Sequence, residues 1–167
     1  MQISTEMVKA LREETQAGIM DCRNALLEAN GNQRKATEIL KKQGLARVQK
    51  RSERTAVEGV VESYVHYGGR IGALIEVNCE TDFVARTEEF KQLAHDLALQ
   101  VAASSPLCLT AEEMPKGSLQ NPNEACLLLQ KSIKDDSKTV QEMVDDVAVK
   151  MREKVTVKRF VRFELGG

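Results

Sequence analysis

The period of the hydrophobic pattern changes near residue 56, and this change limits the possible folds more than any other feature. Before it, apolar residues recur at helical spacing, as in Ala36, Ile39 and Leu40. After it, the pattern alternates as is typical of a β-strand: Val60 and Tyr64 have one parity, and the other is shared by Val57, Gly59, Val61, Ser63 and Val65. The pattern therefore predicts a helical N-terminal module followed by a domain that contains a sheet.

Three short helices are predicted within residues 1–45. Serine, threonine and asparagine can accept the unsatisfied amide hydrogens where a helix starts, and glycine readily adopts the left-handed conformation that closes a helix. The expected limits are Ser4 or Thr5 to Ala17-Gly18, Met20 to Ala29, and Asn32 to Gly44. A bundle of this size has a small core, so we expect it to dock against something larger.

A basic stretch runs from Lys41 to Arg54 and includes the predicted linker, residues 46–55. Glu53 is its only acidic residue, and no strong apolar stripe continues after Val48. One interpretation is a solvated helix extension or connector. The alternative is a patch that meets an acidic partner surface or RNA.

Residues 56–167 are predicted to form an α+β core, in which helices cover a largely antiparallel sheet. Gly68-Gly69 can supply the positive dihedral angles of a hairpin turn before a return strand over residues 71–77. That strand is apolar on both faces, so we expect it to be central. A last strand is predicted to place five alternating apolar residues on one face: Val155, Val157, Val161, Phe163 and Leu165.

Two amphipathic helices are predicted in the core, each with a threonine cap. Thr87 precedes the first, whose apolar stripe is Phe90, Leu93, Ala94, Leu97, Ala98 and Val101. Thr139 and Glu142 form a capping-box signature for the second, whose inward residues are expected to be Met143, Val144, Val147 and Met151. The three prolines lie between these helices, and a short helix is expected after Pro122.

Residue types that perform catalysis or bind metals do not cluster in the sequence. The four cysteines lack zinc spacing and are expected to be small buried hydrophobes: Cys22, Cys79, Cys108 and Cys126. His66 and His95 are expected at the surface or hydrogen-bonded, and the paired aspartates are expected to be solvated. We therefore predict that the chain is not an enzyme and has no metal site and no cofactor.

The charge and hydropathy patterns restrict the partners and the location. The formal net charge of -1 gives no global attraction to nucleic acid or to an anionic membrane. No run of about 18 apolar residues predicts a membrane span. We expect a cytoplasmic location, or an organelle matrix if a transit peptide has been removed.

The turn Thr81-Asp82-Phe83-Val84 follows a strand predicted to be buried and precedes a capped helix. In the structural interpretation, Phe83 packs back onto the core and Asp82 is a turn or cap residue. In the functional interpretation, Phe83 and Asp82 project together as an aromatic anchor beside a carboxylate. A rigid aromatic side chain suits a binding hot spot because it inserts with little loss of conformational entropy.

Three separated segments carry longer motifs. They are MVKALREET (7–15) with AGIMDCRNAL (17–26) and ANG (29–31), then EVNCETDFVA (76–85), and finally VKRFVRFEL (157–165). Together they resemble the translation elongation factor Ts family over nearly the whole chain. The resemblance implies a nucleotide-exchange factor for the GTPase elongation factor Tu, which binds the GDP-bound form and promotes GDP release.

The resemblance also implies a fold and a site. The fold is a three-helix module similar to ubiquitin-associated domains, followed by a core with a three-stranded antiparallel sheet packed by helices. In the family, the aspartate and phenylalanine of the turn, here Asp82 and Phe83, enter the GTPase near its magnesium and nucleotide. The N-terminal module also touches the GTPase, which implicates Met20, Asp21 and Arg23.

This chain differs from the longer family members, which carry a second core subdomain and a helical insertion. Short members pair two copies, so we expect a homodimer through the C-terminal subdomain and a two-plus-two complex. Val161 stands where a short relative has cysteine, so an intersubunit disulfide is not expected there.

Two other functions remain open from the sequence. A ribosome- or RNA-associated protein acting through Lys41 to Arg54 would show salt-dependent RNA binding that survives loss of Phe83. A generic ubiquitin-associated-type peptide-binding module would leave the core unexplained.

Overall fold

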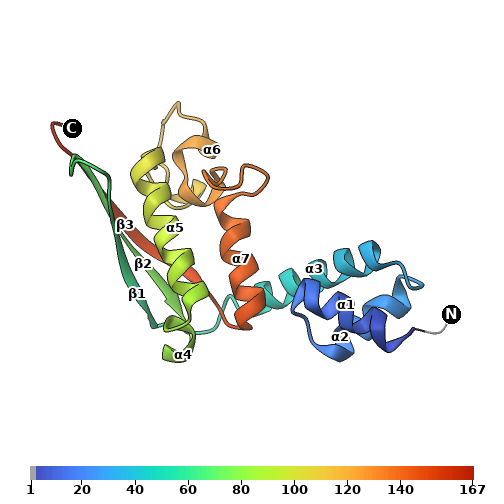
Figure 1. Ribbon diagram of the computed structural model, residues 1–167. Coiled ribbons are helices and arrows are strands. Elements are labelled where there is room, and N and C mark those ends of the chain that lie inside the picture. Colours follow the sequence, from blue (N-terminus) through green and yellow to red (C-terminus); the bar gives the residue numbers. More distant parts are fainter. Residues whose placement is uncertain (1–2) are drawn as a thin grey trace. The chain divides into compact units, whose positions relative to one another are not determined.

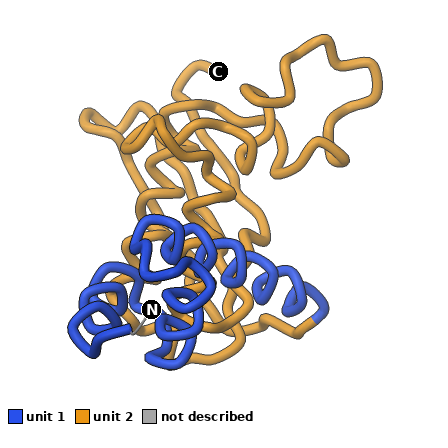
Figure 2. The backbone as a smooth tube through the Cα atoms, turned by 90° about the vertical axis from the view of Figure 1, so that its right-hand side faces the viewer, with its two compact units in different colours: residues 1–53 blue, residues 54–167 orange. Residues whose placement is uncertain are grey.

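The computed structural model describes residues 3–167, and the chain divides into two compact units, Met1–Glu53 and Arg54–Gly167 (Figure 2). The first unit contains helices α1 (Thr5–Thr15), α2 (Ile19–Glu28) and α3 (Gln33–Lys50). Its core consists of small and aliphatic side chains from all three helices: Val8, Leu11, Cys22, Ala25, Leu26, Ala29, Ala36 and Leu40. The predicted three-helix module is thus present.

Two of the expected helix starts are confirmed by their hydrogen bonds. The Ser4 hydroxyl accepts from the Met7 amide at 3.3 Å, and the Asn32 side chain accepts from the Lys35 amide at 3.0 Å. Each bond satisfies one of the amide hydrogens that have no partner inside the helix.

Two predicted helix ends in this unit, at Gly18 and at Gly44, are wrong. Gln16, not Gly18, takes the left-handed conformation after α1, with φ of 56°. Gly18 is instead the N-cap of α2. The third helix does not stop at Gly44, which is buried within it, but continues to Lys50. Arg47 and Lys50 lie in its last turn, where the helix dipole favours cations.

The second unit is built on an antiparallel sheet of β1 (Glu58–Val65), β2 (Ile71–Cys79) and β3 (Thr156–Glu164), in the order β1-β2-β3. The predictions of a central return strand and of the hairpin turn are confirmed. Gly68 and Gly69 have φ of 86° and 69°. The His66 amide donates to the Ile71 carbonyl at 2.8 Å and closes the turn.

One face of the sheet is covered by helix α5 (Glu88–Ser104), and α7 (Val140–Met151) packs against α5 (Figure 1). The predicted apolar stripe of α5 is buried from Phe90 to Val101. The Thr87 cap and the Thr139–Glu142 capping box are both present. The connections contain α4 (Asp82–Ala85), η1 (Ala111–Glu113), α6 (Pro122–Ala125) and η2 (Leu127–Leu129).

The predicted inward face of α7 is only partly right. Val144 is buried, together with Val140 and Ala148, because these residues are four apart and lie on one side of the helix. Met143, Val147 and Met151 are half-buried. Met143 and Val147 lie beside the stripe rather than on it.

A β-bulge in β3 overturns the prediction that its apolar residues share one face. Arg159 pairs with Glu76 and Val157 pairs with the next residue, Val77, so Lys158 is an extra residue. An extra residue reverses the alternation beyond it. Val155 and Val157 are accordingly buried, whereas Val161, Phe163 and Leu165 are exposed.

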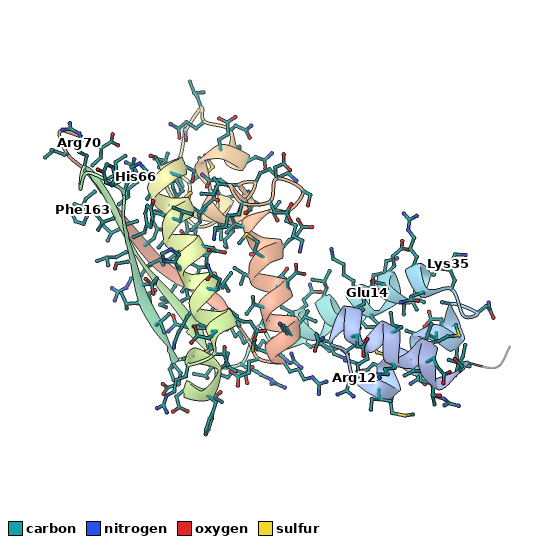
Figure 3. All side chains as sticks on the ribbon, in the orientation of Figure 1. Arg12, Glu14, Lys35, His66, Arg70 and Phe163 are labelled. Carbon is teal, nitrogen blue, oxygen red and sulfur yellow. The ribbon has the colours of Figure 1, made fainter. Side chains whose placement is uncertain are left out.

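The second face of the sheet carries no helix of this unit within residues 54–167 and shows apolar side chains. The pairing places Ser63, Leu74 and Val161 in one row, and Val65, Gly72 and Phe163 in the next. Figure 3 shows Phe163 on the side of the sheet away from α5, and its side chain is 68% exposed. We call this surface the open sheet face.

Gly59 in β1 is expected to tolerate no side chain. Its φ is +150°, and a Cβ atom there would lie 2.1 Å from the Val77 carbonyl oxygen. Because strained backbone costs about 1–3 kcal/mol, Gly59→Ala should lower the free energy of unfolding by at least this amount in urea denaturation. Gly72→Ala is the control, since its nearest atoms are 3.7 Å away. Equal stability of the two variants would contradict the prediction.

Candidate functional site

The Thr81 to Val84 turn joins the end of β2 to the four-residue helix α4. Thr81 is the N-cap, in an extended conformation, and its hydroxyl accepts from the Val84 amide at 3.4 Å. Val84 and Ala85 are buried in the unit. Burial of Val84 therefore holds the inner side of the turn, and the side chain of the preceding residue, Phe83, points outward.

Phe83 is 78% exposed, which overturns the structural interpretation in which it packs onto the core. Val84 takes the buried position instead. Phe83 is directly followed by the buried Val84 and Ala85, so its exposed ring stands on a backbone that is held from one side. This is the geometry that the functional interpretation requires.

Asp82 lies beside Phe83 in the first turn of α4. Its carboxylate forms an ion pair with Arg86 at 2.8 Å, one helical turn away. An exposed pair of this kind contributes little to stability, because water screens it and both side chains lose freedom. The carboxylate can therefore exchange this partner for another at low cost.

The N-terminal candidates lie on the first unit, at the start of α2. Met20 is 61% exposed, and Arg23 is also exposed. Asp21 accepts two hydrogen bonds from the Arg47 guanidinium, both at 3.0 Å, and these bonds raise the pKa of Arg47. Ile19 is exposed next to Met20 and was not among the predicted residues. It lies three and seven residues before the buried Cys22 and Leu26, so helical spacing gave no signal of its exposure.

Two arginines of the basic stretch have acidic partners within the protein. Arg47 pairs with Asp21, and Arg54 pairs with Glu80 at 3.2 Å. Two of the basic side chains between Lys41 and Arg54 are thus paired with carboxylates of the same chain.

The cysteines and histidines lie where the sequence predicted. All four cysteines are buried and free, and burial raises the pKa of Cys79 and of Cys108 to about 11. His66 is hydrogen-bonded to the Tyr64 hydroxyl at 3.1 Å. Over residues 3–167, no group of three or more histidine, cysteine or acidic residues could hold a metal ion. No helix in this range is long and apolar enough to cross a bilayer.

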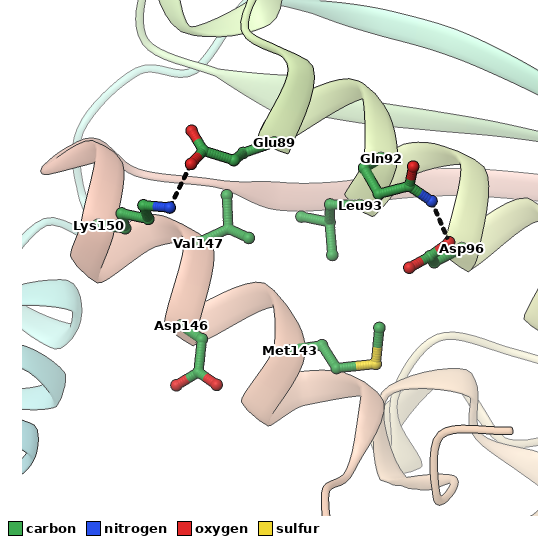
Figure 4. A pocket seen from close by; sticks show the side chains of 8 residues that line it. All are labelled: Glu89, Gln92, Leu93, Asp96, Met143, Asp146, Val147 and Lys150. Atoms are coloured by element: carbon green, nitrogen blue, oxygen red, sulfur yellow. Dashed lines mark hydrogen bonds and ion pairs between the residues drawn. The ribbon is translucent and has the colours of Figure 1, made fainter. Parts of the chain in front are cut away.

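A groove of about 320 Å³ lies between α5 and α7 (Figure 4). Its floor is apolar, and the Lys150–Glu89 ion pair lies at its edge. Its lining residues are Glu89, Gln92, Leu93, Asp96, Met143, Asp146, Val147 and Lys150. None of the predicted site residues belongs to it, so the turn and the groove are separate features.

The residues that sequence reasoning missed lie beneath the turn. The carboxylate of Glu153, in the connection from α7 to β3, accepts hydrogen bonds from the turn. Glu80, just before the turn, accepts one from the Lys154 amide at 2.6 Å. These partners are more than 70 residues apart in the chain, so no local pattern could reveal them.

Comparisons with known proteins agree on one family. The family model described as "Elongation factor TS" matches residues 2–124, which include α1–α3 and the turn. Elongation factor Ts of Moorella thermoacetica is 46% identical over 194 residues, covering 98% of this chain and 96% of the relative. The protein of that name from Syntrophomonas wolfei is 45% identical, with 98% and 91% covered.

The same protein from Thermotoga maritima is 43% identical, with 99% of this chain and 98% of the relative covered. The aligned length of 194 exceeds the 167 residues of the chain, so the relatives have positions at which this chain has no residue. The matches nevertheless run through both units, from the helical N-terminus to the last strand. The chain belongs to the elongation factor Ts family.

Proposed function

We propose that this chain is a guanine-nucleotide exchange factor, which binds elongation factor Tu in its GDP-bound form during translation elongation. The observation that carries the proposal is the exposure of Phe83 directly before the buried Val84 and Ala85. The family and the printed names of the relatives supply the partner. The proposed contacts are the turn, Thr81 to Val84, and the start of α2.

The turn is proposed to disturb the magnesium and phosphate site of the GTPase. Phe83 acts as a wedge, because an aromatic ring on a fixed backbone loses little entropy on insertion. Asp82 holds the displaced arrangement through polar contacts, for which it gives up its exposed pair with Arg86. Magnesium requires near-ideal octahedral geometry, so a small displacement of its surroundings weakens its binding.

The coupling between the factor and GDP is reciprocal. If the bound factor weakens GDP binding, GDP weakens binding of the factor by the same ratio, about 5- to 150-fold for typical couplings. Neither ligand needs to touch the other. It is sufficient that each prefers a different arrangement of the same magnesium site.

The first unit is proposed to supply affinity as a ubiquitin-associated-like module, and residues 46–55 extend α3 to Lys50 and then connect it to the core. Ile19 and Met20 form an exposed apolar pair at the start of α2. Asp21 and Arg23 lie beside them, and the two hydrogen bonds that Arg47 donates to Asp21 join this helix to α3. An apolar pair with a charged edge suits a protein partner better than a nucleic acid.

The experiment that tests the function is release of fluorescent mant-GDP from purified elongation factor Tu, with and without this chain. We expect release to accelerate with concentration of the chain and to saturate. Release at the spontaneous rate at every concentration would refute the proposed function. Addition of RNA should not change the result.

The open sheet face is proposed to bind a second copy of the chain. Val61, Val65, Leu74 and Phe163 are exposed apolar residues on this face, and a face of one sheet can pack on its own copy across a two-fold axis. Facing sheets in proteins pack in this way, about 10 Å apart. Two copies would then support the two-plus-two complex with the GTPase.

We expect sedimentation equilibrium to show a dimer at high protein concentration. Val161→Asp should shift the chain toward monomer, because it places a charge in the middle row of the open sheet face. Leu119→Asp is the control, since Leu119 is exposed in a loop outside the sheet. A monomer for the unchanged chain would remove the dimer from the proposal.

A further inference from the structure

The turn that presents Phe83 is held by a carboxylate from a distant part of the chain. One oxygen of Glu153 accepts hydrogen bonds from the backbone amides of Glu80 and Thr81, both at 3.0 Å. Its other oxygen accepts from the Thr81 hydroxyl at 2.6 Å. A carboxylate with three such donors forms a strong and geometrically specific attachment, because bonds to charged groups are about twice as strong as neutral ones.

A second carboxylate forms the reverse connection. Glu80 accepts from the Lys154 amide at 2.6 Å, and it pairs with Arg54 at 3.2 Å. The ammonium group of Lys154 in turn donates to the Arg54 carbonyl at 2.9 Å. The segment before the turn and the segment after α7 therefore each supply a carboxylate that accepts hydrogen bonds from backbone amides of the other.

The Thr81 hydroxyl links this attachment to α4. It donates its hydrogen to Glu153 and accepts from the Val84 amide, so one hydroxyl joins the carboxylate to the first turn of the helix. A helix of four residues is too short to hold its own conformation. The direction of the exposed Phe83 side chain is thus set by the backbone that Glu153 holds.

We propose that Glu153 is a positioning residue for nucleotide exchange, which orients the turn without touching the partner. The inference rests on the proposed exchange function. It assigns to the α7–β3 connection a role in the action of Phe83 rather than in the stability of the sheet alone.

The variants separate positioning from stability. Glu153→Ala removes all three hydrogen bonds to the turn. Glu153→Gln keeps an amide oxygen that can accept from the two backbone amides and an amide nitrogen that can donate to Thr81. Glu113→Ala is the matched control, because the Glu113 carboxylate accepts from the Leu109 amide at 3.0 Å and does not touch the turn.

The first measurement is mant-GDP release as a function of the concentration of each variant. Glu153→Ala should lower the maximal rate about tenfold or more while the half-saturating concentration changes little, because the contacts of α2 remain. Glu153→Gln should stay within about threefold of the unchanged chain, and Glu113→Ala within about twofold. A variant that is merely partly unfolded would instead raise the half-saturating concentration and reach the normal maximal rate.

The second measurement is amide hydrogen exchange, which needs no GTPase. Glu153→Ala should speed exchange at Glu80, Thr81 and Val84, while the amides of α5 keep their protection. Unchanged exchange at the turn, or an unchanged maximal rate, would overturn the inference. Failure of the unchanged chain to accelerate GDP release would refute the exchange function itself, whereas normal stimulation by the chain and by Glu153→Ala would refute only the role of Glu153.

Discussion

Phe83→Ala is expected to remove most of the stimulated GDP release and to leave the fold intact. Phe83 is 78% exposed, so its truncation creates no cavity and should change the free energy of unfolding by less than about 0.5 kcal/mol. Truncation of a central aromatic anchor of an interface typically costs about 2–4 kcal/mol, which corresponds to a loss of stimulated release of roughly 30-fold to 1,000-fold. Stopped-flow release of mant-GDP measures this loss directly.

Tyr67→Ala is the control for the loss of an exposed ring. Tyr67 is an exposed aromatic residue next to the β1–β2 hairpin glycines, outside the proposed contact. The Tyr67→Ala variant should stimulate GDP release as the unchanged chain does. Wild-type exchange by the Phe83 variant would exclude the wedge mechanism, whatever the Tyr67 variant does.

Phe90→Ala is expected to have the opposite pattern of effects. Phe90 lies only seven residues beyond Phe83 but is 0% exposed, in the stripe of α5 that packs on the sheet. Truncation of a buried phenylalanine leaves a cavity and costs about 3–5 kcal/mol. The midpoint of thermal unfolding should fall by more than roughly 10 °C, as measured by circular dichroism.

The Phe90 variant should still stimulate release at low temperature, in proportion to the folded fraction. The turn and the start of α2 are unchanged in it. A folded Phe90 variant without activity would mean that the stripe of α5 does more than support the sheet. Equal stability of the Phe83 and Phe90 variants would contradict the difference in burial between the two side chains.

Features that depend on neighbouring residues could be predicted from the sequence. The Thr87 cap, the Thr139–Glu142 capping box and the Gly68-Gly69 hairpin each depend on residues within a few positions. The central place of β2 followed from its apolar character on both faces. The left-handed Gln16 was missed, because glycine was the expected residue for that conformation and stood two positions later.

Features that depend on tertiary contact could not be predicted. Local reasoning could not decide whether Phe83 or Val84 takes the buried position, since both are apolar and adjacent. The hydrogen bonds of Glu153 join residues 72 and 73 positions apart. The resemblance to elongation factor Ts implied the turn as the site, but it did not indicate the carboxylate that holds it.

The bulge at Lys158 has a consequence for which positions of β3 tolerate substitution. Before it, the chain contributes Val155 and Val157 to the interior, where a change of side-chain volume lowers the stability of the fold. After it, the same strand displays Val161 and Phe163 outward, where the interior does not constrain them. Arg162, also after the bulge, still faces α5 and donates a hydrogen bond to the Ala102 carbonyl, so only the outward-facing alternate residues lack this constraint. Substitutions at Val161 and Phe163 are therefore expected to change the exposed surface without leaving a cavity in the interior.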